Sequence, residues 1–162
     1  MNPQENVAIL KHVSTEKLKL VKELLELTIK QKESLLAAED NSTELLNRIV
    51  EEKQCIITTI NHLDYDFSSN YDALLDSLGL KSLEGIKEEP VKGFKELKLV
   101  ISEIMTVMQK IKILDDENHR LAIKNMEAIK GQLKTMKTGK MATNSYGKKY
   151  KESPSIFIDR KR

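Results

Sequence analysis

The apolar residues of this chain recur at intervals of three and four over most of its length. The longest such stretch runs from Pro90 to Met136. Its first half places six apolar side chains on one face, namely Phe94, Leu97, Ile101, Ile104, Met108 and Ile111. This spacing matches an α-helix with about 3.6 residues per turn. Because proline is well tolerated in the first turn, Pro90 is expected to begin a long amphipathic helix over 90–136.

Beyond Leu114 the same face becomes mixed in character. Its members are Asn118, Leu121, Asn125, Met126, Ile129, Leu133 and Met136. Asn118 and Asn125 are seven residues apart, so they stack on one side of the helix. Two roles are open for them: a bond to a neighbouring helix of the same chain that fixes its register, or a bond to a bound partner helix. The thioethers of Met126 and Met136 suit either core packing or an adaptable binding surface.

Two shorter stretches predict two further helices. The first, over 3–38, begins with a capping sequence that includes Asn2 and Pro3. The second, over 41–63, begins with Asn41 and has Glu44 three residues later, which resembles a capping box. The short connection between them favours an antiparallel hairpin.

One charged residue, Lys53, falls on the apolar stripe of the second helix. Its stem can pack there, and its ammonium group is expected to reach Glu23 or Glu26 of the first helix. Ser68, Ser69 and Asn70 then interrupt the pattern.

A short helix is predicted over 71–78, with Gly79 as its stop signal. The predicted fold class is therefore all-α: an antiparallel bundle of three long helices with a short helical connection and a flexible basic C-terminal tail. The predicted domains are a helical domain over 1–138 and a tail over 139–162.

The lengths of these helices predict an unpaired segment. The helix over 90–136 exceeds the one over 41–63 by about 24 residues, or roughly 35 Å at 1.5 Å per residue. Met126, Ile129, Leu133 and Met136 would then lack a partner within the chain. Contiguous exposed apolar surface usually marks an interaction site, so this segment is the main functional prediction.

Composition and charge support this organisation. Aromatic residues make up 4% of the 162 residues and charged residues 32%, a profile of long, solvent-exposed helices. The segment 134–162 holds nine Lys or Arg and two carboxylates, a net charge of +7. The rest of the chain, with 18 basic and 23 acidic residues, carries −5. An acidic body with a basic tail is more informative than the total of +2.

No catalytic, cofactor or metal site is predicted. His12, His62 and His119 lack companions at ligand spacing. Cys55, the single cysteine, is expected to be a small buried hydrophobe, and it excludes an internal disulfide. The chain has no apolar run of about 18 residues and no signal-peptide pattern. We therefore expect a soluble, cytoplasmic protein that is not an enzyme.

The order of these signals resembles a known family. The segments concerned are 32–40, Leu45-Leu46, 52–54, 78–80, Ser82-Leu83, Pro90, and the helix bearing Asn118 and Leu121. Taken together, over roughly residues 5–136, they resemble the FlgN-type flagellar export chaperones. The resemblance implies a cytoplasmic, all-helical chaperone of the type III export system, with hook-associated proteins of the hook–filament junction as cargo.

The family resemblance also implies how such a protein works. Its C-terminal region holds the C-terminal helical segment of the cargo and delivers the cargo to the export gate at the membrane. Cargo-binding residues are accordingly expected among Asn118, Leu121, Asn125, Met126, Ile129, Leu133 and Met136. An aromatic residue near the C-terminus is expected to contact the gate, for which Tyr146 is the nearest candidate and Tyr150 the next.

Two other functions compete with the chaperone. A structural coiled-coil protein would use the unpaired segment to form a homodimer. The chaperone itself could also form a homodimer when no cargo is bound. A nucleic-acid adaptor would use the basic tail, where Tyr146 and Tyr150 alternate with Lys148 and Lys149. Because no recognition helix or RNA-binding motif accompanies the tail, nucleic acid is not expected as a partner.

Overall fold

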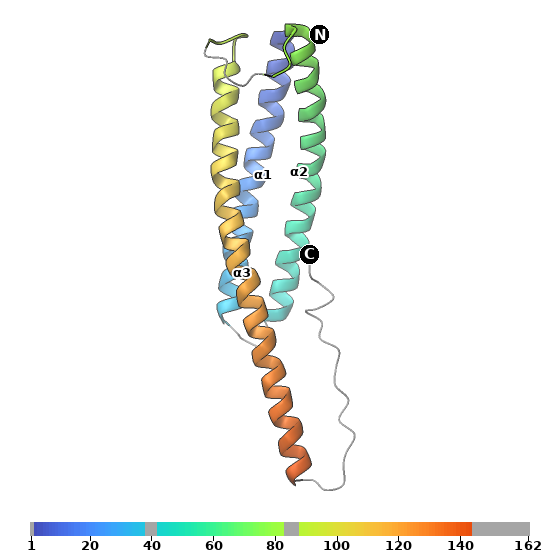
Figure 1. Cartoon of the computed structure of the whole chain (residues 1–162), viewed down its shortest axis with the longest axis vertical. Coiled ribbons are helices and arrows are strands. Elements are labelled where there is room, and N and C mark those ends of the chain that lie inside the picture. Colours follow the sequence, from blue (N-terminus) through green and yellow to red (C-terminus); the bar gives the residue numbers. More distant parts are fainter. Residues whose placement is uncertain (1, 38–41, 83–87, 144–162) are drawn as a thin grey trace.

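The fold is a bundle of three long helices without strands among the described residues, which are 2–37, 42–82 and 88–143 of a computed structural model (Figure 1). The helices are α1 (Pro3–Ala37), α2 (Ser42–Leu78) and α3 (Phe94–Thr143). The all-α prediction is confirmed. No helix in these residues is long and apolar enough to cross a membrane.

Helix α1 begins as the sequence predicts. The Asn2 side chain accepts a hydrogen bond from the Glu5 amide at 2.8 Å, and the Glu5 carboxylate accepts one from the Asn2 amide at 3.3 Å. These reciprocal bonds form a capping box, which satisfies two amides that have no partner inside the helix.

Helix α2 is continuous, so the predicted break between 63 and 71 is wrong. The expected helix over 71–78 forms the last two turns of α2. The Asn70 side chain donates to the Asp66 carbonyl four residues earlier, at 2.8 Å, and therefore sits within the helix instead of ending it. Leu74 and Leu75 are buried in the core. Their packing outweighs the weak local preference of Ser68 and its neighbours for a turn.

Gly79 ends α2 as predicted. Its φ of 68° lies in the left-handed region that favours glycine. The Gly79 amide donates to the Asp76 carbonyl, and the Leu80 amide donates to the Leu75 carbonyl at 3.0 Å. This pair of bonds is a Schellman motif, which satisfies carbonyls at the end of the helix.

Helix α3 begins at Phe94, and the prediction of a start at Pro90 is wrong. Gly93 has a φ of 91°, so the helix cannot extend back through it. The Glu89 carboxylate accepts hydrogen bonds from the amides of Gly93 and Lys95 and so caps the first turn. At its other end α3 continues to Thr143, beyond the predicted end at Met136 and across the predicted domain boundary at 139.

The core lies along α1, which packs against both other helices. In the described residues α2 and α3 each contact α1 but make no close backbone contact with one another. One cluster of buried side chains lies near the start of α1, and a second lies midway along the bundle. The second cluster contains Val21, Leu24, Ile60, Ile104, Val107 and Ile111.

Helices α1 and α3 run parallel, and α2 runs antiparallel to both. Three ion pairs join α1 to α3, and the residue numbers of both partners increase from one pair to the next: Lys11–Glu96, Lys22–Glu103 at 3.2 Å and Lys32–Glu117 at 2.7 Å. The antiparallel pair α1–α2 has the opposite order, with Lys17–Asp64 at 2.6 Å and Lys53 bonded to Gln31 at 2.8 Å.

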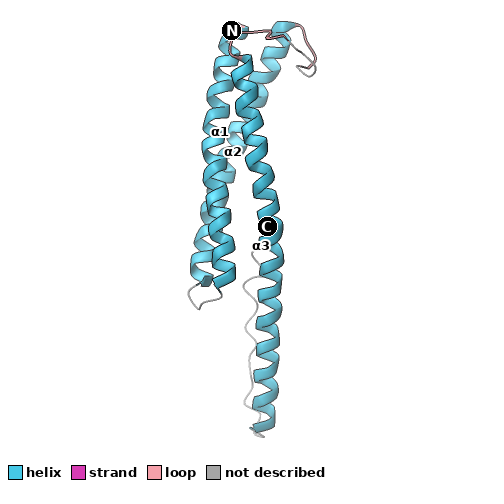
Figure 2. Cartoon of the chain, turned by 90° about the vertical axis from the view of Figure 1, so that its left-hand side faces the viewer, coloured by secondary structure: helices cyan, strands magenta, loops and turns pink. Residues whose placement is uncertain are grey.

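The last part of α3 projects beyond the bundle. The Asn125 side chain lies on the Leu35 carbonyl, so Ala37, the last residue of α1, is level with about residue 127. Residues 128–143, which we call the overhang, therefore extend about 24 Å past α1 (Figures 1 and 2). The overhang is shorter than the predicted 35 Å because α2 has 37 residues and matches more of α3 than expected.

Candidate functional site

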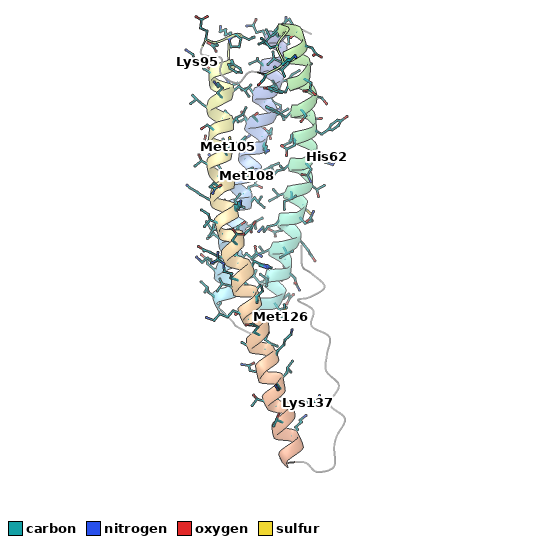
Figure 3. The ribbon with its side chains drawn as sticks, in the orientation of Figure 1. His62, Lys95, Met105, Met108, Met126 and Lys137 are labelled. Atoms are coloured by element: carbon teal, nitrogen blue, oxygen red, sulfur yellow. The ribbon has the colours of Figure 1, made fainter. Side chains whose placement is uncertain are left out.

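The overhang carries an apolar stripe that no other described part of the chain covers. Ile129 is 40% exposed, Met136 is 55% exposed, and Leu133 is half-buried. We call these three side chains the overhang stripe. The predicted unpaired apolar segment is therefore present, although it begins near residue 128. Figure 3 shows Met126 where the overhang begins and Lys137 farther along it.

The overhang is also strongly basic. It contains four lysines, Lys130, Lys134, Lys137 and Lys140, and no acidic residue. A basic surface with an apolar stripe attracts an amphipathic partner that carries carboxylates.

A groove lies between α2 and α3. Its α3 residues, within 115–126, directly precede the overhang in the chain. Helix α1 forms its floor with Leu24 and Leu35, and its volume is about 450 Å³. The apolar side chains of its walls are Leu46, Val50 and Ile57 from α2, and Ala122, Ile123 and Met126 from α3. The groove exists because α2 and α3 pack on α1 without closing on each other.

Sequence reasoning missed this groove. The helix lengths predicted an unpaired segment from Met126 onward, but the sequence does not indicate which pair of helices stays apart within the bundle. The one available signal was Ala122, whose small side chain leaves space on a face otherwise lined by large residues.

The two asparagines predicted to bind cargo are bonded to α1. Asn118 is 3% exposed, and its amide donates to the Thr28 carbonyl at 3.1 Å. Asn125 donates to the Leu35 carbonyl at 3.0 Å. Of the two roles left open by the sequence, these bonds match the one that fixes the register of α3 on α1. A cargo contact by either amide would require its bond to α1 to open.

Lys53 crosses the floor of the groove from α2. Its ammonium group lies 2.8 Å from the Gln31 amide oxygen and 2.8 Å from an Asp115 carboxylate oxygen, and its side chain is only 12% exposed. The predicted partners Glu23 and Glu26 are wrong, because α3 rather than α1 supplies the carboxylate. This ion pair joins the two walls of the groove.

The family of the chain follows from a comparison with protein-family models. A model described as "FlgN protein" matches residues 1–154. The chain belongs to the FlgN family. This is a family of flagellar export chaperones. Comparisons with curated proteins and with solved structures gave no match.

Three further predictions concern Cys55, a metal site and two tyrosines near the C-terminus. Cys55 is exposed, so the prediction that it is buried is wrong. In the described residues no group of three His, Cys, Asp or Glu side chains is placed to hold a metal ion. Tyr146 and Tyr150 lie outside the described residues, and their contact with an export gate stays a prediction.

Two carboxylates of the FlgN-family bundle have altered acidity. The Lys32 ammonium group donates a hydrogen bond to Glu117 and lowers the pKa of that carboxyl below its usual 4.5. Lys11 lowers the pKa of Glu96 in the same way. Both pairs join α1 to α3, so they favour the packed state while the carboxylates are ionised.

Proposed function

We propose that this FlgN-family protein is a cytoplasmic export chaperone that binds the C-terminal helical segment of hook-associated proteins and brings them to the flagellar export gate. The observation that carries the proposal is the overhang, a helix that continues about 24 Å beyond the bundle with exposed Ile129 and Met136 on one face. A helix end whose apolar stripe is left uncovered by the other described residues suits a cargo helix.

The mechanism needs no nucleotide or cofactor. A cargo segment that forms helix contacts in its final assembly would self-associate early if its apolar face were left in water. The overhang covers that face until the export gate competes for the complex. If about 600 Å² of apolar surface is buried, roughly 15 kcal/mol is available at about 25 cal/mol per Å² before association costs, enough for micromolar to nanomolar affinity.

The cargo contacts are assigned to five of the seven predicted residues. Ile129, Leu133 and Met136 form the overhang stripe, while Met126 and Leu121 are half-buried where the overhang joins the bundle. Tyr146, with Tyr150 as the next candidate, is proposed to contact the gate from the basic tail.

A matched pair of substitutions tests the cargo site. Met136 and Met105 are both exposed methionines of α3, but only Met136 lies on the overhang stripe. Met136→Glu should weaken binding of a hook-associated protein's C-terminal segment about tenfold or more, since it places a charge in an apolar contact. Isothermal titration calorimetry measures the affinity, with Met105→Glu as the control. Equal affinity of the two variants would contradict the proposal.

The homodimer remains the competing function. Two overhangs paired about a twofold axis would set four lysines against four lysines, which disfavours that contact. Light scattering over a dilution series distinguishes the homodimer from the chaperone. A dimer that persists at nanomolar concentration would leave no overhang available for cargo.

A further inference from the structure

The groove and the overhang stripe form one continuous face of α3. Asp115, Asn118, Ala122 and Met126 line the groove at intervals of three and four residues. The overhang stripe of Ile129, Leu133 and Met136 continues the same intervals. Side chains at this spacing share one side of a helix. The combined surface, which we call the composite face, runs from residue 115 to residue 136, or about 32 Å at 1.5 Å per residue.

The upper half of the composite face has the shape of a vacant helix position. Two helices that pack directly lie about 8–10 Å apart, whereas α2 and α3 make no close backbone contact in the described residues. Apolar side chains of both walls line the space between them, with Leu24 and Leu35 of α1 below. A helix laid there would contact all three and complete a four-helix arrangement.

The charges along the composite face indicate which kind of partner can bind there. Lys130 and Lys134 lie along its lower half, and Lys137 and Lys140 follow directly after its end. Asp115 lies at its upper end, next to Asp116 in the sequence, and both aspartates are exposed. The segment 144–162 of this chain has six basic and two acidic residues and would meet like charge on the overhang. A second copy paired through the same face would meet the same repulsion.

We infer that the composite face holds a single amphipathic helix of about 20 residues whose carboxylates lie over the overhang, with its other end inserted between α2 and α3. This inference rests on the proposed function, and it extends the cargo site from the overhang into the bundle. The helix runs in a fixed direction, because its acidic end faces Lys130 and Lys134 and its far end faces Asp115 and Asp116. Lys53, bonded to Asp115 across the floor, marks the closed end of the site.

The first test separates the groove from the overhang. Ile123 lines the groove, whereas Ile113 on the same helix is 52% exposed and does not. With the full-length protein and the C-terminal segment of a hook-associated protein as probe, Ile123→Glu should weaken binding about tenfold or more. Ile113→Glu should stay within about twofold of the unsubstituted protein. Ala122→Phe, which fills the groove without removing a core side chain, should also weaken binding about tenfold.

Thermal unfolding followed by circular dichroism verifies that each variant is folded. The inference is overturned if Ile123→Glu and Ala122→Phe, both folded, bind like the unsubstituted protein while Met136→Glu does not. In that outcome the cargo site is confined to the overhang, and the proposed function survives. Failure of the unsubstituted protein to bind the segment would instead refute the proposed function.

The second test addresses charge with probes of defined sequence. Two synthetic helical peptides of about 20 residues share the same leucine heptad, and one has glutamates where the other has lysines. The glutamate peptide should bind at least about tenfold more tightly. The double variant Lys130→Glu/Lys134→Glu should abolish the preference, because its overhang then has two lysines and two glutamates. Equal binding of the two peptides, or an unchanged preference in the double variant, would overturn the charge assignment.

Discussion

Asn118 joins α3 to α1 at the depth of the core. Its amide donates to the Thr28 carbonyl at 3.1 Å and also lies 3.4 Å from the Gln31 amide oxygen, while its own carbonyl oxygen is buried without a hydrogen-bond partner among the described residues. A buried polar side chain with directional bonds permits one register of two parallel helices and penalises the others.

Truncation of Asn118 should therefore destabilise the bundle. Asn118→Ala removes the bonds and leaves a cavity, and we expect the free energy of unfolding to fall by about 1–3 kcal/mol. Urea denaturation monitored by circular dichroism measures the change. His119→Ala is the matched control, since His119 is exposed at the next position, and it should leave the midpoint almost unchanged. A similar loss in both variants would refute the role assigned to Asn118.

Because of the ion pair Lys32–Glu117, we expect the stability of the protein to depend on pH in the acidic range. Because the pKa of Glu117 is lowered in the folded protein from its usual 4.5, its contribution to stability is present above that usual value and is lost as the pH falls through the lowered value. Glu96 acts in the same direction. Urea midpoints between pH 7 and pH 3 should decrease, and the decrease should be smaller in Glu117→Gln. An identical pH profile for the variant would exclude this contribution.

At the scale of the elements, the sequence predicted the helices better than their ends. The spacing of Phe94, Leu97, Ile104 and Ile111 predicted the buried face of α3, although Met108 on that face is 39% exposed and Val107 beside it is buried. The end of α2 at Gly79 was predictable because a glycine after the last apolar position has a direct backbone role. The break at Ser68–Asn70 and the start at Pro90 were wrong because burial of Leu74 and the left-handed φ of Gly93 depend on tertiary contacts.

Gly131 within α3 and Gly93 just before α3 should respond oppositely to the same substitution. Gly131 lies within the overhang helix, and a methyl group there meets no described atom within 4 Å beyond its adjoining residues and the adjacent helix backbone. Gly131→Ala should stabilise the overhang by about 0.5–1 kcal/mol, seen as slower amide hydrogen exchange of residues 128–143. Gly93→Ala should destabilise the protein, because φ is +91° and the new methyl lies 3.4 Å from Val7. Faster exchange in Gly131→Ala would contradict the helical overhang.

At the scale of the whole molecule, part of the candidate site was predictable and part was not. The exposed apolar positions Ile129 and Met136 follow from the excess length of one helix, which is a property of the sequence. The groove depends on α1 being the central helix, and apart from the small side chain of Ala122 nothing in the separate helices, including Leu46 and Val50, reveals which helices remain apart. Which of three similar helices pack together depends on how the volumes of many side chains fit at once, and no single stripe shows this.

The central position of α1 also sets an order of assembly. Helices α1 and α2 are separated by only four residues in the sequence, whereas the bonds between α1 and α3 join positions 81 to 90 apart in the chain. Short loops close at smaller entropic cost than long ones, so we expect the α1–α2 hairpin to form first and α3 to join it last. The helix that holds the proposed cargo surface is thus expected to dock last during synthesis, onto a hairpin that is already in place.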